Sequence, residues 1–182
     1  MLQRVCVFCG SQPGHSPAHA AAARALGRLL AARGIDLVFG GGRVGLMGTI
    51  ADEVLQRGGR AIGVIPRALM ERELGHTGVS ELHVVGSMHE RKALMAELSD
   101  AFVALPGGFG TLEEICEAIT WAQLGLQPKP CALLDVEDYW APLVQLFDQA
   151  VAAGFVAPAS RALVLHERDP GVLLDALARG RP

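Results

Sequence analysis

A glycine-rich segment, Pro106-Gly107-Gly108-Phe109-Gly110-Thr111, stands between a short apolar run and a helix-forming stretch that begins Leu112-Glu113-Glu114. Glycines let a backbone approach an anion closely, and the free N–H groups and positive dipole end of a following helix then hold the charge. Thr111 can add a hydroxyl, and no lysine follows the glycines as it would in a Walker loop. The segment predicts a cradle for a monophosphate that uses no metal.

The same residues also fit a purely structural role. Thr111-Leu112-Glu113-Glu114 reads as a capping box, in which Thr111 caps the helix and Glu114 reaches back to the cap. Capping accounts for the threonine and the glutamate, but not for three glycines within the four positions Gly107 to Gly110. We therefore favour ligand binding, with a helix expected over 111–124.

A basic residue interrupts the apolar face of a second expected helix, over 88–99, which Ser87 is placed to cap. Arg91 falls on this face at helical spacing with three apolar residues, which are Leu94, Met95 and Leu98. A guanidinium that points inward needs a partner, so Arg91 either forms a buried salt bridge, for example to Glu97 or Glu114, or faces a ligand. We favour the ligand, since Lys92 beside it adds local positive charge.

A first glycine loop satisfies the pattern G-x-G-x-x-G at Gly40, Gly42 and Gly45. A dinucleotide site is disfavoured because the loop follows the second strand, and no acidic residue ends the next strand, Arg60–Ile65, to hold a ribose. Two interpretations stay open. The glycines permit a tight turn and close helix–sheet contact, or they let a phosphate or base approach near Gly41 and Gly42.

Short apolar runs alternate with longer helical patterns along the whole chain. Strands are expected at Arg4–Cys9, Asp36–Phe39, Arg60–Ile65, Glu81–Val85, Ala101–Leu105, Cys131–Asp135 and Arg161–His166. Helices are expected near 17–33, 44–57, 88–99, 111–124, 139–153 and 170–179. Several of the strands are apolar almost throughout, as in sheets covered on both faces. The pattern predicts an α/β fold, a Rossmann-like doubly wound parallel sheet of about seven strands flanked by helices.

The expected architecture limits where a ligand can lie. In open parallel sheets the binding crevice lies beyond the carboxyl ends of the strands. Four turns follow strands there, and we expect all four at the same edge. They are Gly10-Ser11, Gly40–Gly45, Gly86–Arg91 and Pro106–Thr111.

The bulk properties fit a single 182-residue nucleotide-binding domain over residues 1–182, with 51% hydrophobic residues. A formal net charge of −3 argues against a protein that coats nucleic acid. No signal peptide or membrane-spanning run is apparent, so no membrane partner and a cytoplasmic location are expected. Cys6 and Cys9 lie three apart on a strand and so on opposite faces, which disfavours a redox pair or shared metal. With Cys116 and Cys131 they are expected to be free thiols.

Taken together, these motifs resemble the LONELY GUY (LOG) family of cytokinin riboside 5′-monophosphate phosphoribohydrolases, long mislabelled as lysine decarboxylases. The most specific match is Met88-His89-Glu90-Arg91-Lys92 followed by Pro106 through Glu114. The resemblance reaches to about residue 156 and includes Cys6–Ser11, Gly40–Gly48, Gly63–Pro66 and Thr120–Gly125. No position of the paired motifs departs from the family pattern.

The resemblance implies a homodimer and hydrolysis without a cofactor or metal, with Arg91 and Glu114 as the catalytic residues. It places substrate contacts at Glu73, Arg91, Lys92, Gly108, Phe109, Gly110, Thr111, Leu112, Glu113, Glu114 and Thr120. From the neighbouring loops we add Ser11, Gly41, Gly42, Met88 and Gly107. The expected substrate is a small nucleoside monophosphate. Decarboxylation would need a pyridoxal phosphate lysine. No pyridoxal-binding pattern surrounds Lys92, and Lys129 lies at a strand start, the wrong end of the sheet.

The implied reaction is hydrolysis of the N-glycosidic bond of an adenosine 5′-monophosphate, plain or N6-modified, to free base and ribose 5-phosphate. Positive charge then develops at the anomeric carbon, and Glu114, one turn beyond the phosphate loop, is the candidate to stabilise it. Three alternatives stay open. They are a nucleotide or molybdenum-cofactor carrier on the same fold, a general purine monophosphate nucleosidase, and an NAD-dependent oxidoreductase, which the missing ribose acid disfavours.

Overall fold

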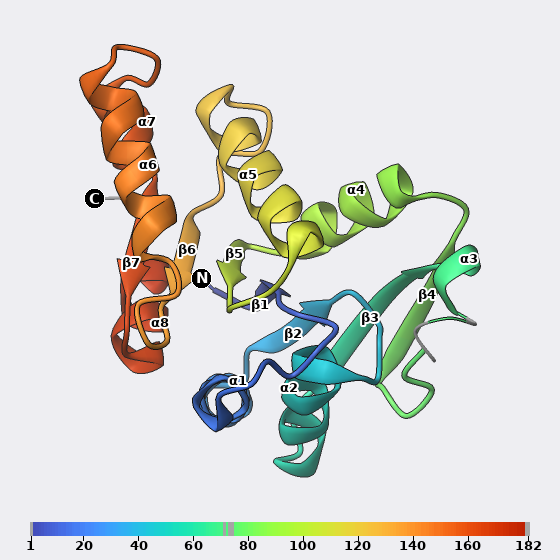
Figure 1. The fold of residues 1–182 in the computed structure, drawn as a ribbon. Coiled ribbons are helices and arrows are strands. Elements are labelled where there is room, and N and C mark those ends of the chain that lie inside the picture. The colour runs from blue at the N-terminus through green and yellow to red at the C-terminus, as the bar shows by residue number, and fades with distance from the viewer. Residues whose placement is uncertain (1, 71, 73–74, 181–182) are drawn as a thin grey trace.

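The computed structural model describes residues 2–70, 72 and 75–180, which form one parallel sheet with helices on both faces (Figure 1). The strands are β1 (Arg4–Phe8), β2 (Asp36–Phe39), β3 (Ala61–Pro66), β4 (Glu81–Val85), β5 (Ala101–Ala104), β6 (Cys131–Leu134) and β7 (Val164–Glu167). The helices are α1 (Pro17–Ala32), α2 (Gly45–Gln56), α3 (Arg67–Met70), α4 (Met88–Leu98), α5 (Phe109–Gln123), α6 (Ala141–Ala152), α7 (Pro158–Arg161) and α8 (Pro170–Ala178).

The sheet has seven strands in the order β4-β3-β2-β1-β5-β6-β7, and every pair of neighbours is parallel. This confirms the predicted fold class. The chain fills one half of the sheet outward from β1 to β4 and the other half from β5 to β7. The strand order therefore reverses between β1 and β5, which is where ligands bind in open α/β sheets.

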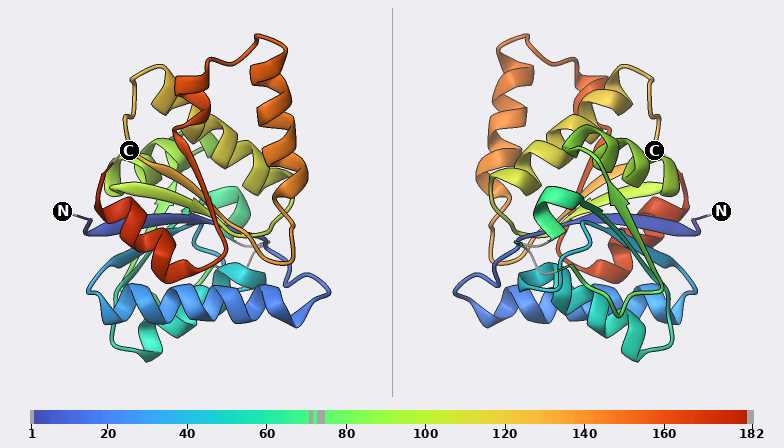
Figure 2. Two further views of the ribbon diagram at one scale, coloured as in Figure 1. Left: turned by 90° about the vertical axis from the view of Figure 1, so that its left-hand side faces the viewer. Right: turned by 90° about the vertical axis from the view of Figure 1, so that its right-hand side faces the viewer.

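Strand residues alternate between two hydrophobic clusters, one on each face. Val5 and Val7 of β1 belong to the cluster under α1, α2 and α8, whereas Cys6 and Phe8 belong to the cluster under α4 and α5. Cys9 lies with the first cluster, so Cys6 and Cys9 are on opposite faces as predicted. All four cysteines are free. The two helical layers are seen edge-on in Figure 2.

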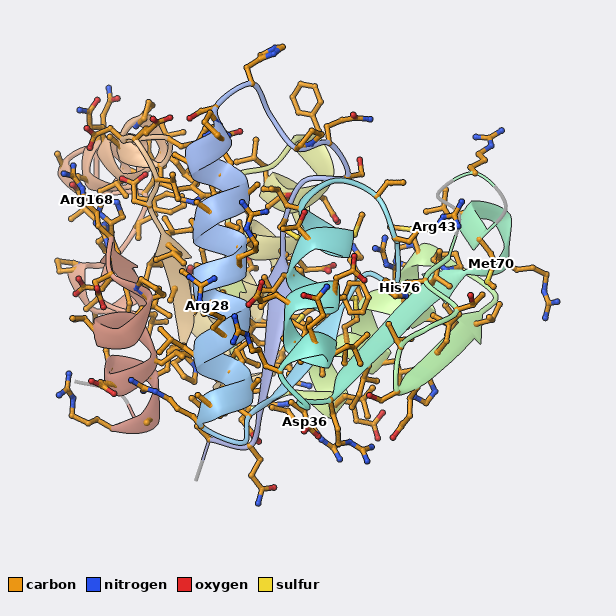
Figure 3. All side chains as sticks on the ribbon, turned by 90° about the horizontal axis from the view of Figure 1, so that it is seen from below. Arg28, Asp36, Arg43, Met70, His76 and Arg168 are labelled. Atoms are coloured by element: carbon orange, nitrogen blue, oxygen red, sulfur yellow. The ribbon has the colours of Figure 1, made fainter. Side chains whose placement is uncertain are left out.

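On the lower face α1 and α2 lie side by side, as Figure 3 shows from below. Arg28 of α1 reaches toward α2, where its Nη1 lies 3.7 Å from Oε1 of Glu53 (Figure 3). Leu26 of α1 is fully buried in the cluster that these helices share with the sheet. Within the described residues, no helix is both long enough and apolar enough to cross a membrane.

Predicted and observed elements differ in two places. The strand expected at Arg161–His166 begins only at Val164, because Pro158 starts a helical turn, α7, that ends at Arg161. The short helix α3 after β3 was not predicted, since four residues are too few for a periodic signal. Both differences lie outside the loops that follow β1, β2 and β5.

The core makes a stability prediction at Leu26. We expect Leu26→Ala to lower the free energy of unfolding by about 2–5 kcal/mol, since it opens a cavity among close-packed side chains. Chemical denaturation measures the change. The matched control is Val172→Ala on α8, where the side chain is 48% exposed and a change within about 0.5 kcal/mol is expected. Equal losses in the two variants would contradict the packing described here.

Candidate active site

A crevice of about 200 Å³ lies at the carboxyl edge of the sheet, where the strand order reverses. The loop after β1 and the loop after β5 meet there, since the Gly10 N–H donates to the Pro106 carbonyl at 3.1 Å. The four turns predicted to share one edge all contribute to it. The lining residues are Val7, Phe8, Cys9, Gly10, Ser11, Gly40, Met47, Arg91, Gly108, Phe109, Gly110, Thr111 and Glu114.

Helix α5 points its N-terminal end at this crevice. The helix begins at Phe109, and its N-cap is Gly108, which has an extended backbone and no side chain to offer. The predicted capping box is therefore wrong, because Thr111 lies inside the first helical turn and is buried. The first N–H groups of a helix have no intrahelical partner. With no side-chain cap, those of α5 are available to an anion.

The three glycines of this loop differ in the space around them. A Cβ on Gly107 would lie 2.1 Å from the Thr111 hydroxyl and 2.8 Å from the Gly10 nitrogen. A Cβ on Gly108 or Gly110 would meet nothing within 4 Å. Gly107 is thus required by packing, whereas nothing in the protein itself requires glycine at the other two positions. The open space at Gly108 and Gly110 is where a ligand can approach the backbone.

Arg91 is buried at the floor of the crevice, with 6% of its surface exposed. Its Nε donates to the Val64 carbonyl at 3.2 Å, and its Nη2 donates to the Gly40 carbonyl at 3.1 Å. The remaining nitrogen, Nη1, lies 3.7 Å from Oε1 of Glu114. Arg91 thus forms the buried salt bridge of the first interpretation, and it also lines the crevice in which a ligand would lie.

Glu114 lies one helical turn beyond the uncapped start of α5 and is 9% exposed. Its carboxylate faces the Arg91 guanidinium across the crevice. The crevice thus combines an anion-binding helix end with a fixed carboxylate roughly one turn, about 5 Å, further along. Such an arrangement suits a ligand that carries a phosphate close to a centre where positive charge develops.

Lys92 makes its contacts with α5 rather than with the crevice. Its ammonium lies 2.5 Å from Oε1 of Glu113 and 2.9 Å from Oε2 of Glu117, and the side chain is 10% exposed. Burial alone lowers the pKa of Lys92, but hydrogen bonds to the two carboxylates outweigh it, so the pKa is raised overall. The lysine therefore stays charged and links α4 to the start of α5.

The first glycine loop is explained by packing inside the protein. A Cβ on Gly40 would lie 2.0 Å from the Arg91 guanidinium, and one on Gly45 would lie 2.3 Å from the Ser11 backbone. Gly41 and Gly45 also have φ values of +76° and +62°, which favour glycine. The loop makes room for Arg91 and for the turn after β1, which favours the structural alternative.

The other predicted site residues occupy different surroundings. Ser11 lines the crevice, while Met88 lies above it with its sulfur 3.7 Å from Arg91 Nη1. Gly42 pairs with Gly75 in an isolated bridge. Leu112 packs against the core cluster under α5, and Thr120 lines a separate pocket between α5 and α6. Glu73 lies outside the described residues.

Several residues near the crevice were not among the predicted site residues, and Cys9, Met47 and Tyr139 are three of them. Burial first, and the nearby Glu114 second, raise the pKa of the Cys9 thiol, so it stays protonated and is no nucleophile. Cys9 directly precedes the Gly10 turn, so its position at a strand end was a usable signal. Tyr139 contacts Gly107, which lies 32 residues earlier in the sequence, so no local sequence pattern predicts this contact.

Fold and crevice together define a Rossmann-like α/β protein with a crevice, at the point where strand order reverses, toward which an uncapped helix end points. In the described residues, no three His, Cys, Asp or Glu side chains gather in a way that would hold a metal ion.

Comparison with known proteins shows which family within this class the chain resembles. Residues 47–177 match a family model described as "Possible lysine decarboxylase". The chain is 49% identical over 181 residues to the probable cytokinin riboside 5′-monophosphate phosphoribohydrolase LOGL2 of Oryza sativa subsp. japonica, covering 100% of this chain and 74% of that protein. It is 52% identical over 164 residues to the cytokinin riboside 5′-monophosphate phosphoribohydrolase LOG1 of Arabidopsis thaliana, covering 90% and 77%.

Among solved structures, the molybdenum cofactor binding protein of the phototrophic bacterium Rippkaea orientalis has the same fold, with a TM-score of 0.72 at 23% identity, over 98% of this chain and 97% of that one. The chain belongs to the LOG family, the cytokinin riboside 5′-monophosphate phosphoribohydrolases. This confirms the family resemblance predicted from the paired motifs.

The lysines give no support to the decarboxylase description. The Lys92 ammonium is held by two carboxylates, and Lys129 donates to the Ala96 carbonyl at 2.6 Å beside the start of β6. The start of a strand is at the opposite edge of a parallel sheet from the crevice. Neither lysine is therefore placed in the crevice to form a Schiff base with a ligand.

The glycine packing predicts different outcomes for two similar substitutions. Gly110→Ala is expected to keep or slightly raise stability, since alanine favours a helix by about 0.5–1 kcal/mol, but to weaken binding of ribose 5-phosphate. Gly107→Ala is expected to destabilise the fold through its clash with Thr111. Thermal denaturation and isothermal titration calorimetry separate the two effects. Unchanged affinity in Gly110→Ala would place the phosphate elsewhere.

Proposed function

We propose that this protein hydrolyses the N-glycosidic bond of adenosine 5′-monophosphates, including N6-modified ones, to release the free base and ribose 5-phosphate. The observation that carries the proposal is the buried Arg91–Glu114 pair one helical turn from the uncapped start of α5. Relatives that are about half identical over most of the chain carry the name of this activity.

In this proposal the 5′-phosphate binds the first turn of α5, between Gly108 and Thr111. Backbone N–H groups and the helix dipole neutralise its charge without a metal. Anchoring the phosphate there brings the ribose toward Glu114, because the sugar carbons lie within a few bonds of the phosphate. The phosphate thus supplies binding energy that positions the reacting bond.

Glu114 then acts at the anomeric carbon. Cleavage leaves positive charge on the ribose, as in glycoside hydrolysis, and a carboxylate beside it stabilises that charge or orients the attacking water. Arg91 holds the carboxylate in place, since its other nitrogens are fixed to the Val64 and Gly40 carbonyls. A guanidinium remains protonated at neutral pH, so Arg91 orients groups rather than donating a proton.

Two rival functions use the same fold. A molybdenum-cofactor carrier would bind a phosphorylated pterin without cleaving it, and the similar carrier-type structure shares 23% identity with this chain. A general purine monophosphate nucleosidase would run the same chemistry on another base. The paired Arg91 and Glu114 favour an enzyme over a carrier, because binding alone does not require a carboxylate beside an anion site.

The phosphate dependence is the direct test. We expect purified protein, without added metal, to release adenine from AMP and the free base from isopentenyladenosine monophosphate. Adenosine, which lacks the phosphate, is expected to react with a kcat/KM roughly 100-fold lower or worse. Glu114→Gln is expected to lower kcat by about 100-fold or more. Chromatographic quantification of the free base gives all these rates.

Glu97→Gln on exposed α4 surface serves as the matched carboxylate control. Comparable turnover of adenosine and AMP would contradict the phosphate anchor. An active Glu114→Gln variant would contradict the role of the carboxylate. No base release from either nucleotide would favour the carrier, and mass spectrometry of the protein as purified would then identify what it carries.

We also propose that the protein is a homodimer that joins across α5 and α6. No residue of α6 is buried, although most of its residues are apolar. Leu146 on α6 is 57% exposed, and Leu124 and Leu126 at the end of α5 are 62% and 68% exposed. Thr120 lines the pocket between these helices. A second copy of the chain would cover these side chains and lie beside Thr120.

Sedimentation velocity tests this assembly. The wild type is expected to sediment as a dimer, and Leu146→Asp is expected to shift it toward monomer, because a carboxylate is costly to bury in an apolar interface. The control is Val172→Asp on α8, which lies on the other face of the sheet. A monomeric wild type, or a dimer that survives Leu146→Asp, would contradict this interface.

A further inference from the structure

The phosphate loop has a hydrogen-bond partner outside the two motifs. The hydroxyl of Tyr139 donates to the carbonyl of Gly107, which is 32 residues earlier in the chain. Tyr139 also lines a second pocket of about 250 Å³ that shares Gly10, Ser11 and Gly108 with the crevice. The tyrosine therefore contacts the loop from the side facing this second pocket.

The turn that carries Tyr139 has an unusual backbone. Glu137 and Asp138 have φ values of 54° and 60°, a left-handed backbone conformation that residues other than glycine rarely adopt. Two such residues in succession occur in tight turns of the type that normally uses glycine, and they persist only when the surroundings hold them. The strained backbone at these two residues sets the position of the next residue, Tyr139, beside Gly107.

Hydrogen bonds and ring contacts hold the turn. The Trp140 N–H donates to Oδ1 of buried Asp135 at 3.0 Å, and Oδ2 of Asp135 lies 2.8 Å from Nε2 of His166. The Tyr139 ring packs edge-on against Trp140, with centroids 5.0 Å apart, and against His19 at 6.3 Å. The hydroxyl is therefore held at a fixed point above Gly107.

The peptide between Gly107 and Gly108 needs such a fixed point. It has no Cβ on either side, so its plane can rotate between orientations that most residue pairs exclude. In a trans peptide the C=O and the following N–H point in opposite directions. A partner that holds the Gly107 carbonyl on one side thus directs the Gly108 N–H to the other side.

We infer that Tyr139 is a positioning residue, whose hydroxyl fixes the Gly107–Gly108 peptide so that the Gly108 N–H points at the bound phosphate. The inference rests on the proposed phosphate site at the start of α5. It assigns a role to the turn after β6, which lies outside both glycine loops and the arginine motif. Tyr139 acts through the loop and does not touch the reacting atoms.

The test compares binding rather than turnover. In a Glu114→Gln background, which is expected to slow hydrolysis by about 100-fold or more, calorimetry gives the affinity for AMP and for adenosine with and without Tyr139→Phe. Phenylalanine keeps the ring against Trp140 and His19 and removes only the hydroxyl. We expect AMP to bind roughly 3- to 10-fold more weakly, the effect of one hydrogen bond, with adenosine affinity and thermal stability little changed.

Two substitutions at Asp138 test the turn itself. Asp138→Gly and Asp138→Val both remove the exposed contact between Asp138 and Arg168. Glycine accepts the left-handed backbone readily and β-branched valine does not, so Asp138→Val is expected to weaken AMP binding as Tyr139→Phe does, while Asp138→Gly retains the affinity. Comparing these two variants separates the effect of displacing Tyr139 from the effect of losing a surface charge.

Equal AMP affinity with and without the hydroxyl would overturn the inference, and so would an equal loss of AMP and adenosine affinity, which would indicate that the hydroxyl contacts the nucleoside rather than the phosphate loop. The proposed function fails separately, if wild-type protein releases no base. Should AMP not bind the Glu114→Gln protein at all, the phosphate site is wrong and the inference falls with it.

Discussion

A buried guanidinium must be hydrogen-bonded and paired with a charge, and this requirement at Arg91 connects most parts of the site. Its side chain binds the carbonyls that follow β2 and lie within β3, and its third nitrogen faces Glu114 on α5. Gly40 has no side chain because the guanidinium occupies that space. One residue thus fixes the relative positions of the end of β2, the strand β3 and two helices.

The electrostatic balance around α5 follows from the same pairing. The start of this helix is the proposed anion site, yet its first three turns carry Glu113, Glu114 and Glu117. Lys92 binds the outer two carboxylates and Arg91 binds the inner one. Neutralised in this way, the carboxylates do not cancel the positive end of the helix dipole. Glu114 alone keeps its carboxylate at the crevice.

The predictions that hold depend on residues that are close together in the chain. Alternation of apolar runs and helical patterns gave the parallel sheet, and strand ends gave the edge that holds Ser11 and Arg91. Sequence reasoning failed at Thr111, since a capping box and a first-turn threonine share one pattern and only the backbone of Gly108 separates them. Tyr139 was missed because its contact depends on how β6 lies relative to β5.

The two glycine loops show why a motif alone does not define a ligand site. Both follow a strand and precede a helix, and both place that helix without a side-chain cap. In the first loop, Cβ atoms on Gly40 and Gly45 would collide with the protein's own atoms. In the second, Gly108 and Gly110 face empty space. A glycine that faces open space indicates a ligand site more strongly than a glycine required by internal packing. Contacts within the protein do not explain why such a position lacks a side chain, whereas the approach of a ligand does.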